Sequence, residues 1–264
     1  MIDTYILKLG GSVITEKKSG RPLVTPRVKA IAREIMLFRS KKKSARLIIL
    51  YGGGSFGHPL AHRYQLVDQK LSPDTLVSVG YTISAMRELG TRLATTLLDA
   101  GIPVVPLQTS SFTDVRQGTL HFSNLSTIHT ILESGGIPLF GGDVVFSDHT
   151  RTTIVSADRL VVELARRLKK TQLFFATDTD GVYATFPPQK SEHPLATLDR
   201  TALRKLLKAQ QSGNAGTDVT GAMLGKLRAL LHAHDTTAMI FNGNSSGSLV
   251  GALGGERLGT RIVL

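Results

Sequence analysis

Short apolar runs alternate along the chain with stretches whose hydrophobic residues recur at helical spacing. We expect a buried strand at each of these runs: Tyr5–Leu9, Leu47–Tyr51, Ile102–Leu107, Ile137–Phe140, Leu173–Ala176, Ala238–Phe241 and Arg261–Leu264. The helical spacing is clearest in these sets: Val28, Ile31, Ile35 and Phe38; Leu89, Leu93 and Leu97; Leu160, Leu164 and Leu168; Met223, Leu227, Leu230 and Leu231. Strands joined through helices need crossover connections, which favour a mainly parallel sheet covered on both faces. The alternation therefore predicts an α/β fold, a three-layer αβα sandwich around a mainly parallel central sheet.

Loops are concentrated in the C-terminal third of the sequence. We expect them at Tyr183–Leu198, Gln210–Thr220 and Asn242–Gly247, where proline, glycine and small polar residues gather. We therefore predict a soft division near residue 171. It would separate an N-terminal lobe, residues 1–171, from a C-terminal lobe, residues 172–264, with one continuous sheet running through both.

Composition excludes several classes of protein. The 264 residues include no cysteine, which rules out a disulfide scaffold, an iron–sulfur protein and a thiolate zinc site. The first residues lack the pattern of a secretory signal, and no apolar run approaches the roughly 18 residues of a membrane helix. We therefore expect a cytoplasmic protein that contacts no membrane, and we identify no metal-ligating residues.

The charge balance is strongly basic, with 32 lysine and arginine residues against 20 acidic ones and a net charge of +12. A polyanion partner, an anionic small substrate or a solvated surface could each account for it. The cationic clusters at Lys41–Lys43 and Arg166–Lys170 lie where predicted helices end, so we interpret both as solvated helix ends that complement the helix dipole. The sequence has no basic stripe interleaved with aromatic residues, so we expect no nucleic-acid partner.

Two glycine-rich turns, residues 10–12 and residues 52–58, directly follow predicted strands. Glycine lets the backbone approach a phosphate closely and present several N–H groups to it, and a following helix N-terminus adds positive potential. Gly52, Gly54 and Gly57 also satisfy the dinucleotide pattern G-x-G-x-x-G, but the acidic residue expected about 20 positions later would be Asp68 or Asp74, in a polar loop, which makes the signal weak. From the glycines alone, either turn could also be a tight strand-to-helix connection without a ligand.

Charged residues near these turns favour phosphate binding. Lys8 lies within a predicted buried strand just before the first turn, where an unpaired ammonium group needs a nearby anion. Asp178 and Asp180 follow another buried strand, at the end where α/β sheets bind ligands. Asp218 begins a further polar segment, and Lys226 lies on the helix beyond it.

The order and spacing of these motifs resemble the amino acid kinase superfamily over essentially the whole chain. The motifs are KLGGS at 8–12, GGGSFGH at 52–58, GGDV at 141–144, TDTDGVY at 177–183 and DVTGAM at 218–223. Within the superfamily, the serine and phenylalanine before His58 are similar to isopentenyl phosphate kinases and the related fosfomycin kinases. The resemblance implies a homodimeric kinase that uses ATP and Mg²⁺ to phosphorylate an existing phosphate or phosphonate group.

The resemblance also implies catalytic roles. Lys8 and Lys226 would bind the transferring phosphates from opposite sides, Lys17 would stabilise the transition state, and Asp158 would orient the catalytic lysines. His58 would bind the acceptor phosphate through an imidazole that titrates near neutral pH. From the residues alone, Asp158 could be the N-cap of the following helix, Lys17 part of a solvated lysine pair, and His58 a structural histidine.

Two sets of binding residues follow from the same motifs. The implied ATP-binding residues are Lys8, Gly10, Gly11, Ser12, Gly54, Asp178, Gly181, Tyr183, Ala222 and Lys226. The implied acceptor-binding residues are Gly53, Gly54, His58 and Ala157. Ala157 and Ala222 stand where many isopentenyl phosphate kinases carry glycine. For the apolar tail of an acceptor we consider Tyr81, Ile83, Met86 and Leu89, on a helix expected from about Leu76 to Ala100, although such a stripe equally fits a core.

The leading functional hypothesis is conversion of isopentenyl phosphate to isopentenyl diphosphate by ATP, a step of isoprenoid biosynthesis. A fosfomycin-type phosphonate kinase is the alternative within the superfamily, because Ala222 and Pro106–Gln108 resemble that group. The third hypothesis, motivated by the net charge, is a non-catalytic protein that binds nucleotide or nucleic acid with the same fold.

Overall fold

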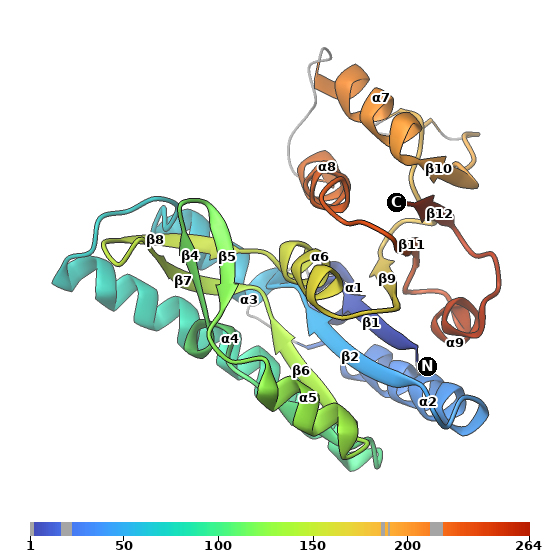
Figure 1. Cartoon of the computed structure of the whole chain (residues 1–264), viewed down its shortest axis with the longest axis horizontal. Helices are drawn as coiled ribbons and strands as arrows, with labels where there is room; N and C mark the ends of the chain where they lie inside the picture. The colour runs from blue at the N-terminus through green and yellow to red at the C-terminus, as the bar shows by residue number, and fades with distance from the viewer. Residues whose placement is uncertain (1–2, 17–22, 186–187, 190, 212–218) are drawn as a thin grey trace.

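The computed structural model describes residues 3–16, 23–185, 188–189, 191–211 and 219–264. In these residues the main sheet has eight strands in the order β10-β12-β11-β9-β1-β2-β6-β3 (Figure 1). The strands are β1 (Thr4–Leu9), β2 (Arg46–Tyr51), β3 (Val104–Pro106), β6 (Ile137–Gly141), β9 (Thr171–Thr177), β10 (Thr197–Asp199), β11 (Thr237–Asn242) and β12 (Thr260–Val263). Every neighbouring pair is parallel except β11 with β12. The predicted mainly parallel sheet is confirmed, and each expected strand overlaps an observed one.

Side chains along the strands alternate between two hydrophobic cores. In β1, Ile6 faces one core, whereas Tyr5 and Leu7 face the other. The helices that cover the first core include α6 (Ala157–Arg167), α7 (Arg200–Gln211) and α8 (Val219–Leu230). Those that cover the second include α2 (Thr25–Lys41), α4 (Pro73–Asp99) and α9 (Ser248–Gly254). Helices on both faces form the three-layer sandwich that the sequence predicts.

A second sheet, of four strands in the order β5-β4-β7-β8, was not predicted from the sequence. Its strands are β4 (Thr113–Arg116), β5 (Thr119–Phe122), β7 (Asp143–Ser147) and β8 (Arg151–Val155). The sheet lies along the N-terminal half of α4 (Figure 1), where Val144 packs with Val79 and Leu66. These strands are short and only partly buried, so they lack the long apolar runs of the main sheet.

The connections agree with the sequence in part. The remaining short elements are α1 (Gly11–Ile14), α3 (Gly54–Arg63), α5 (Ser126–Glu133) and the 3₁₀ turn η1 (Thr109–Ser111). The loop at Asn242–Gly247 is confirmed between β11 and α9. The expected loop Tyr183–Leu198 is too long, because its last two residues belong to β10, a strand that the sequence did not predict. Most of residues 210–220 lie outside the described residues. Both cationic clusters lie at helix ends, as predicted, because α2 ends at Lys41 and α6 at Arg167.

The helix α4 confirms the long helix expected in this part of the chain. Met86 and Leu89 are buried in the second core, Ile83 is half-buried, and Tyr81 is 61% exposed. The hydrophobic stripe therefore serves mainly as core. In the described parts of the chain, no helix is long and apolar enough to span a membrane.

Candidate active site

Parallel strands bring four loop segments to one edge of the main sheet. β1 pairs with β2 on one side and with β9 on the other, and β11 pairs with β9, all in parallel. Their carboxyl ends therefore lie together, and the segments that follow them are residues 10–12, 52–58, 177–183 and 242–247. Ligands of open α/β sheets bind outside this edge, so the sequence motifs converge where a ligand is expected.

The two glycine-rich turns contact each other directly. The Gly10 N–H donates to the Ala176 carbonyl at 2.9 Å, which ties the first turn to β9. A Cβ atom on Gly11 would overlap the backbone of Gly54. Gly54 itself has a φ of +48°, a conformation that favours glycine. The glycines are thus needed for the turns to pack together at the edge of the sheet, whatever ligand they bind.

A buried group of charges, which we call the lysine–aspartate cluster, lies beside the first turn. Lys8 Nζ of β1 lies 3.2 Å from Asp158 Oδ1, and Lys226 Nζ of α8 lies 2.9 Å from the same oxygen. Lys8 is 8% exposed and Lys226 is 3% exposed. The Lys226 ammonium also lies 5.2 Å from the centroid of the Phe175 ring, a cation–π contact. The fold therefore brings together three of the predicted catalytic residues from three separate elements.

Among the residues that the structure describes, the lysine–aspartate cluster carries surplus positive charge, because two ammonium groups share one carboxylate. Burial opposes ionisation of Asp158, but the charges and hydrogen bonds of Lys226 and Lys8 outweigh it and lower its pKa to about 2. Burial lowers the pKa of Lys226 to about 8, against the opposing attraction of Asp158. A buried charge without compensation is costly, so a bound anion would stabilise this cluster.

The N-cap of α6 is Ser156, whose hydroxyl accepts a hydrogen bond from the Arg159 N–H at 3.2 Å. The alternative interpretation of Asp158 as the N-cap is therefore wrong. Asp158 lies in the first turn of the helix, where the helix dipole also favours a carboxylate. Its side chain is free of the capping role and binds the two lysines instead.

The predicted acceptor-binding residues lie around the second turn and at the start of α6. His58 is exposed on α3. A Cβ atom on Gly53 would lie 3.4 Å from Met86 Sδ and 3.5 Å from His58 Cδ2, so Met86, considered for the acceptor tail, lies beside this turn. Ala157 is buried, and its backbone N would lie 2.9 Å from a Cβ atom on Gly142.

The remaining predicted nucleotide-binding residues, beyond Lys8 and the two glycine-rich turns, follow β9 or lie on α8. Asp178 and Ala222 are exposed. Gly181 is buried in a position without space for a Cβ atom. Tyr183 is buried, and burial together with the charge of Asp180 raises the pKa of its phenol, which stays neutral as a hydrogen-bonding group.

Thr15 is a residue of this edge that sequence reasoning missed. It is buried, its hydroxyl donates to the Gly11 carbonyl at 2.7 Å, and the same oxygen accepts a hydrogen bond from the Ser55 N–H at 3.1 Å. Thr15 therefore joins the two glycine-rich turns. Ser12 is half-buried in α1, whereas Lys17 and Asp218 lie outside the described residues.

Asp143, in the GGDV motif, holds a neighbouring turn in place. It is buried and accepts hydrogen bonds from the N–H groups of Ser110 at 3.2 Å and Val144 at 2.9 Å, and from the Gln108 side chain. Burial raises its pKa, against the effect of these hydrogen bonds. The motif was visible in the sequence, but the turn that it anchors was not.

Phosphoryl transfer needs fixed positive charge and close backbone N–H groups more than it needs covalent chemistry from the protein. The fold and the edge described above supply both, so the chain is of the class of α/β phosphotransferases. Sequence comparison narrows that class, since the model of the amino acid kinase family matches residues 3–242. The chain belongs to the amino acid kinase family, and it is a kinase that uses ATP.

Individual relatives agree with this membership. The chain is 35% identical to the isopentenyl phosphate kinase of Methanothermobacter thermautotrophicus, over 97% of this chain and 98% of the relative. It is 32% identical to the isopentenyl phosphate kinase of Methanocaldococcus jannaschii, over 97% of each. A solved structure of isopentenyl phosphate kinase matches with a TM-score of 0.81 at 29% identity, covering 98% of this chain and all of that one. The UMP kinase of Bacillus anthracis, at 18% identity and a TM-score of 0.66 over 98% and 95% of the two chains, shares the fold. The resemblance and the fold class predicted from the sequence are confirmed.

Proposed function

We propose that the chain transfers the γ-phosphoryl group of ATP to isopentenyl phosphate and so forms isopentenyl diphosphate. Similarity to isopentenyl phosphate kinases over nearly the full length of both chains supports this acceptor. The observation that carries the proposal is the surplus charge of the lysine–aspartate cluster, since donor and acceptor phosphates bring the negative charge that the cluster lacks. A single ammonium–phosphate contact at ~4 Å is worth about 4 kcal/mol at an effective dielectric constant of ~20.

The lysines act mainly through their fixed positions. Lys8 and Lys226 neutralise charge on the transferring phosphoryl group, and Asp158 holds both ammonium groups before any substrate binds. Charges that are already in place need no reorganisation as the transition state forms, which is the largest contribution to many enzymatic rate enhancements. Lys17 is assigned to transition-state stabilisation by the family motif alone.

The remaining assignments follow the two sides of the site. We assign ATP binding to Gly10, Gly11, Ser12, Gly54, Asp178, Gly181, Tyr183 and Ala222, together with the two lysines of the cluster. We assign acceptor binding to Gly53, Gly54, His58 and Ala157. Acceptor binding and dimer contacts would then belong to residues 1–171, and residues 172–264 would bind ATP together with the two glycine-rich turns and Lys8 of the N-terminal lobe. The homodimer enters the proposal through the family resemblance, and the cytoplasmic location through the composition of the sequence.

We propose that Mg²⁺ is bound to the phosphates of ATP. Among the residues that the structure describes, no group of three His, Asp or Glu side chains is placed to hold a metal ion. Mg²⁺ at kinase sites is bound largely by substrate phosphates and water, with few protein carboxylates. We therefore expect Mg²⁺ to arrive on the nucleotide, where it neutralises phosphate charge.

An acceptor panel tests the proposal. The chain is incubated with ATP, Mg²⁺ and, separately, isopentenyl phosphate, dimethylallyl phosphate, fosfomycin, N-acetylglutamate or UMP, and ADP release is followed. We expect the highest kcat/KM with isopentenyl phosphate. Activity confined to fosfomycin would show that the acceptor is a phosphonate and would contradict the proposal. Absence of ADP release with every acceptor would favour nucleotide or nucleic-acid binding without catalysis.

Two separate substitutions on α3, one at His58 and a control at His62, test the acceptor side of the site. His58→Ala should lower kcat/KM for isopentenyl phosphate about tenfold, since a hydrogen bond to a charged group is lost, while the KM for ATP changes little. His62→Ala, an exposed histidine of the same helix, is the matched control and should change neither value. An equal loss of ATP affinity in His58→Ala would remove His58 from the acceptor site.

A further inference from the structure

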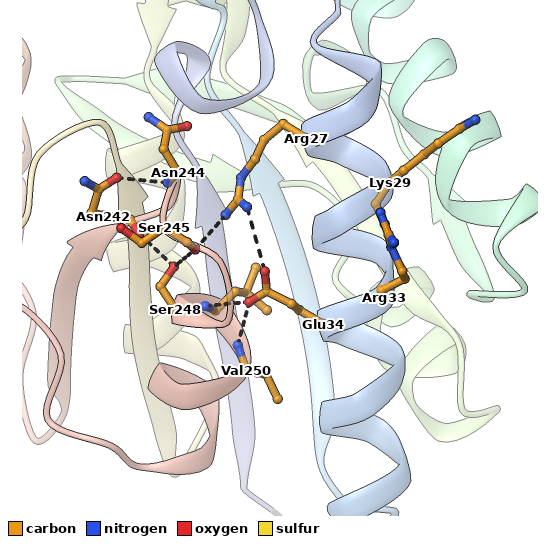
Figure 2. Close-up of polar contacts among 10 residues, drawn as sticks. Arg27, Lys29, Arg33, Glu34, Asn242, Asn244, Ser245, Ser248 and Val250 are labelled. Carbon is orange, nitrogen blue, oxygen red and sulfur yellow. Dashed lines mark hydrogen bonds and ion pairs between the residues drawn. The ribbon is translucent and has the colours of Figure 1, made fainter.

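A second buried polar group, the Arg27–Glu34 cluster, joins α2 to α9 and to the loop of residues 242–247 (Figure 2). Glu34 is 8% exposed, and its Oε2 accepts hydrogen bonds from the N–H groups of Leu249 at 2.9 Å and Val250 at 3.1 Å. These N–H groups belong to the first turn of α9, where a helix has no internal partners for them. Glu34 therefore caps a helix that lies 215 positions away in the sequence.

The loop before α9 is held by its own polar groups. Ser248 Oγ lies 2.7 Å from the Asn242 carbonyl oxygen and 2.8 Å from the Ser245 carbonyl oxygen. The Asn242 side-chain oxygen accepts a hydrogen bond from the Asn244 N–H at 2.9 Å (Figure 2). Because Ser248 is the first residue of α9, the position of α9 fixes the position of the loop.

The other side of this loop contacts the nucleotide end of the sheet. Asn242 Nδ2 donates to Asp180 Oδ1 at 2.8 Å, and the Gly243 N–H donates to the Thr177 carbonyl at 2.7 Å. A Cβ atom on Gly243 would lie 2.8 Å from Ala176 Cβ, so the loop is packed closely against β9. A displaced loop would therefore displace the segment from Asp178 to Gly181 that we assign to ATP.

Arg27 is the weaker member of the cluster. Its Nη1 lies 3.8 Å from Glu34 Oε1, and its Nη2 lies 3.5 Å from the Ser245 carbonyl oxygen, both longer than typical hydrogen bonds. Its charge balances that of Glu34, so this cluster has no surplus that an external anion would compensate. Lys29 and Arg33 extend from α2 away from the loop and are exposed (Figure 2).

We propose that Glu34 is a positioning residue for ATP binding, which acts through α9 and the loop of residues 242–247. The inference rests on the proposed kinase function, since it requires this loop to border the ATP site. If Glu34 only stabilised the fold, its substitution would weaken the binding of both substrates alike. A positioning residue on the nucleotide side should affect ATP and ADP more than the acceptor.

Substitutions of Glu34 test this role in the full chain. Both N–H groups bind one carboxylate oxygen, so the neutral amide oxygen of Glu34→Gln can still accept them more weakly, whereas Glu34→Ala leaves both unpaired. We expect the Kd for ADP and the KM for ATP to rise about tenfold in Glu34→Ala and about threefold in Glu34→Gln. The KM for the acceptor should change less than about twofold. Arg33→Ala, an exposed arginine of the same helix, should match the wild type.

ADP affinity is measured by calorimetry on variants whose circular dichroism shows a folded chain. Unchanged ADP affinity in folded Glu34→Ala, or an equal loss for ATP and the acceptor, would overturn the positioning role. If Glu34→Ala does not fold, unchanged ADP affinity in Glu34→Gln would overturn it. A wild-type chain that binds ADP but phosphorylates no acceptor would contradict the kinase proposal, and the ADP measurements on the variants would still decide the role of Glu34.

Discussion

The lysine–aspartate cluster and the Arg27–Glu34 cluster are both buried, but their charges are balanced differently. In the first, two ammonium groups share one carboxylate oxygen at 3.2 and 2.9 Å. In the second, one guanidinium faces one carboxylate, which also accepts two backbone N–H groups. Since a buried charge is costly unless it is compensated, a bound anion would balance the charge of the first cluster, whereas the charges of the second balance each other.

The difference shows that charge balance, more than burial, separates a binding site from a structural connection. Both clusters join elements that are distant in the sequence, and the side chains of both are largely hidden from solvent. The net charge of +12 does not distinguish the two clusters, because each exposed cation at the ends of α2 and α6 adds as much to it as a buried lysine of the site does. We therefore expect substitutions at the two clusters to change stability and activity to different extents.

The largest effect is expected from removal of the shared carboxylate. Asp158→Asn leaves two buried ammonium groups without a counter-charge, and we expect a loss of about 3–5 kcal/mol in the free energy of unfolding. Urea unfolding measures it. Asp114→Asn, which removes an exposed ion pair with Arg116, is a control with little expected effect. Equal stability of Asp158→Asn and the wild type would show that the cluster does not need the charge of Asp158.

The same substitution should change the acid dependence of stability. The pKa of Asp158 is about 2, below its ordinary value of 3.8, so its contribution is fully present above pH ~4 and is lost as the pH falls towards ~2. In that interval the wild type should lose stability more steeply than Asp158→Asn.

Removal of one ammonium group should separate activity from stability. Lys8→Met leaves a balanced Asp158–Lys226 pair, so we expect an unfolding midpoint equal to or above that of the wild type, with kcat at least ~100-fold lower. Lys29→Met removes an exposed lysine and serves as the control in both assays. Full activity of Lys8→Met would show that the surplus charge is not needed for catalysis.

Titration of Lys226 should give an alkaline limit to ATP use. The pKa of Lys226 is about 8 in the folded chain, below the ordinary 10.5, so the folded chain releases this proton at a lower pH than the unfolded chain does. The free energy of unfolding should therefore rise between pH ~8 and ~10.5. Over the same interval kcat/KM for ATP should fall, because the positive charge is lost. Lys226→Arg stays charged, so its lower kcat/KM should remain nearly flat up to pH ~9, where the wild type loses about tenfold. Parallel pH profiles would assign the alkaline limit to another group.

The smallest effect is expected at the Arg27–Glu34 cluster. Arg27→Met leaves Glu34 with both backbone N–H partners, so we expect a loss of about 1 kcal/mol in stability and less than about threefold in kcat. Thermal unfolding and steady-state kinetics measure these. A loss of kcat as large as that of Lys8→Met would remove the distinction between the two clusters.

Local patterns predicted most of the main sheet because its central strands contain continuous apolar runs such as Leu47–Tyr51, buried on both faces. They missed the second sheet, whose strands are short and have a solvated face. Hydrophobic periodicity in the sequence therefore predicts the elements that build the core better than those that lie over it.

Within the candidate site, the glycine-rich turns and Lys8 could be recognised from local pattern. The partner Asp158 came from the family resemblance, since it lies 68 positions from Lys226. Thr15 and Glu34 were missed, because a hydroxyl that joins two turns or a carboxylate that caps a distant helix has no signal in local spacing. Such contacts depend on the complete fold.

The central claim is that the surplus charge at Lys8, Asp158 and Lys226 serves phosphoryl transfer to a phosphate acceptor. Phosphorus-31 NMR of the chain with ATP, Mg²⁺ and isopentenyl phosphate tests this claim most directly. We predict that the phosphomonoester signal is replaced by the two coupled signals of a diphosphate as ADP forms, and that Lys8→Met slows this replacement at least ~100-fold. ADP formation with release of inorganic phosphate and an unchanged isopentenyl phosphate signal would contradict it.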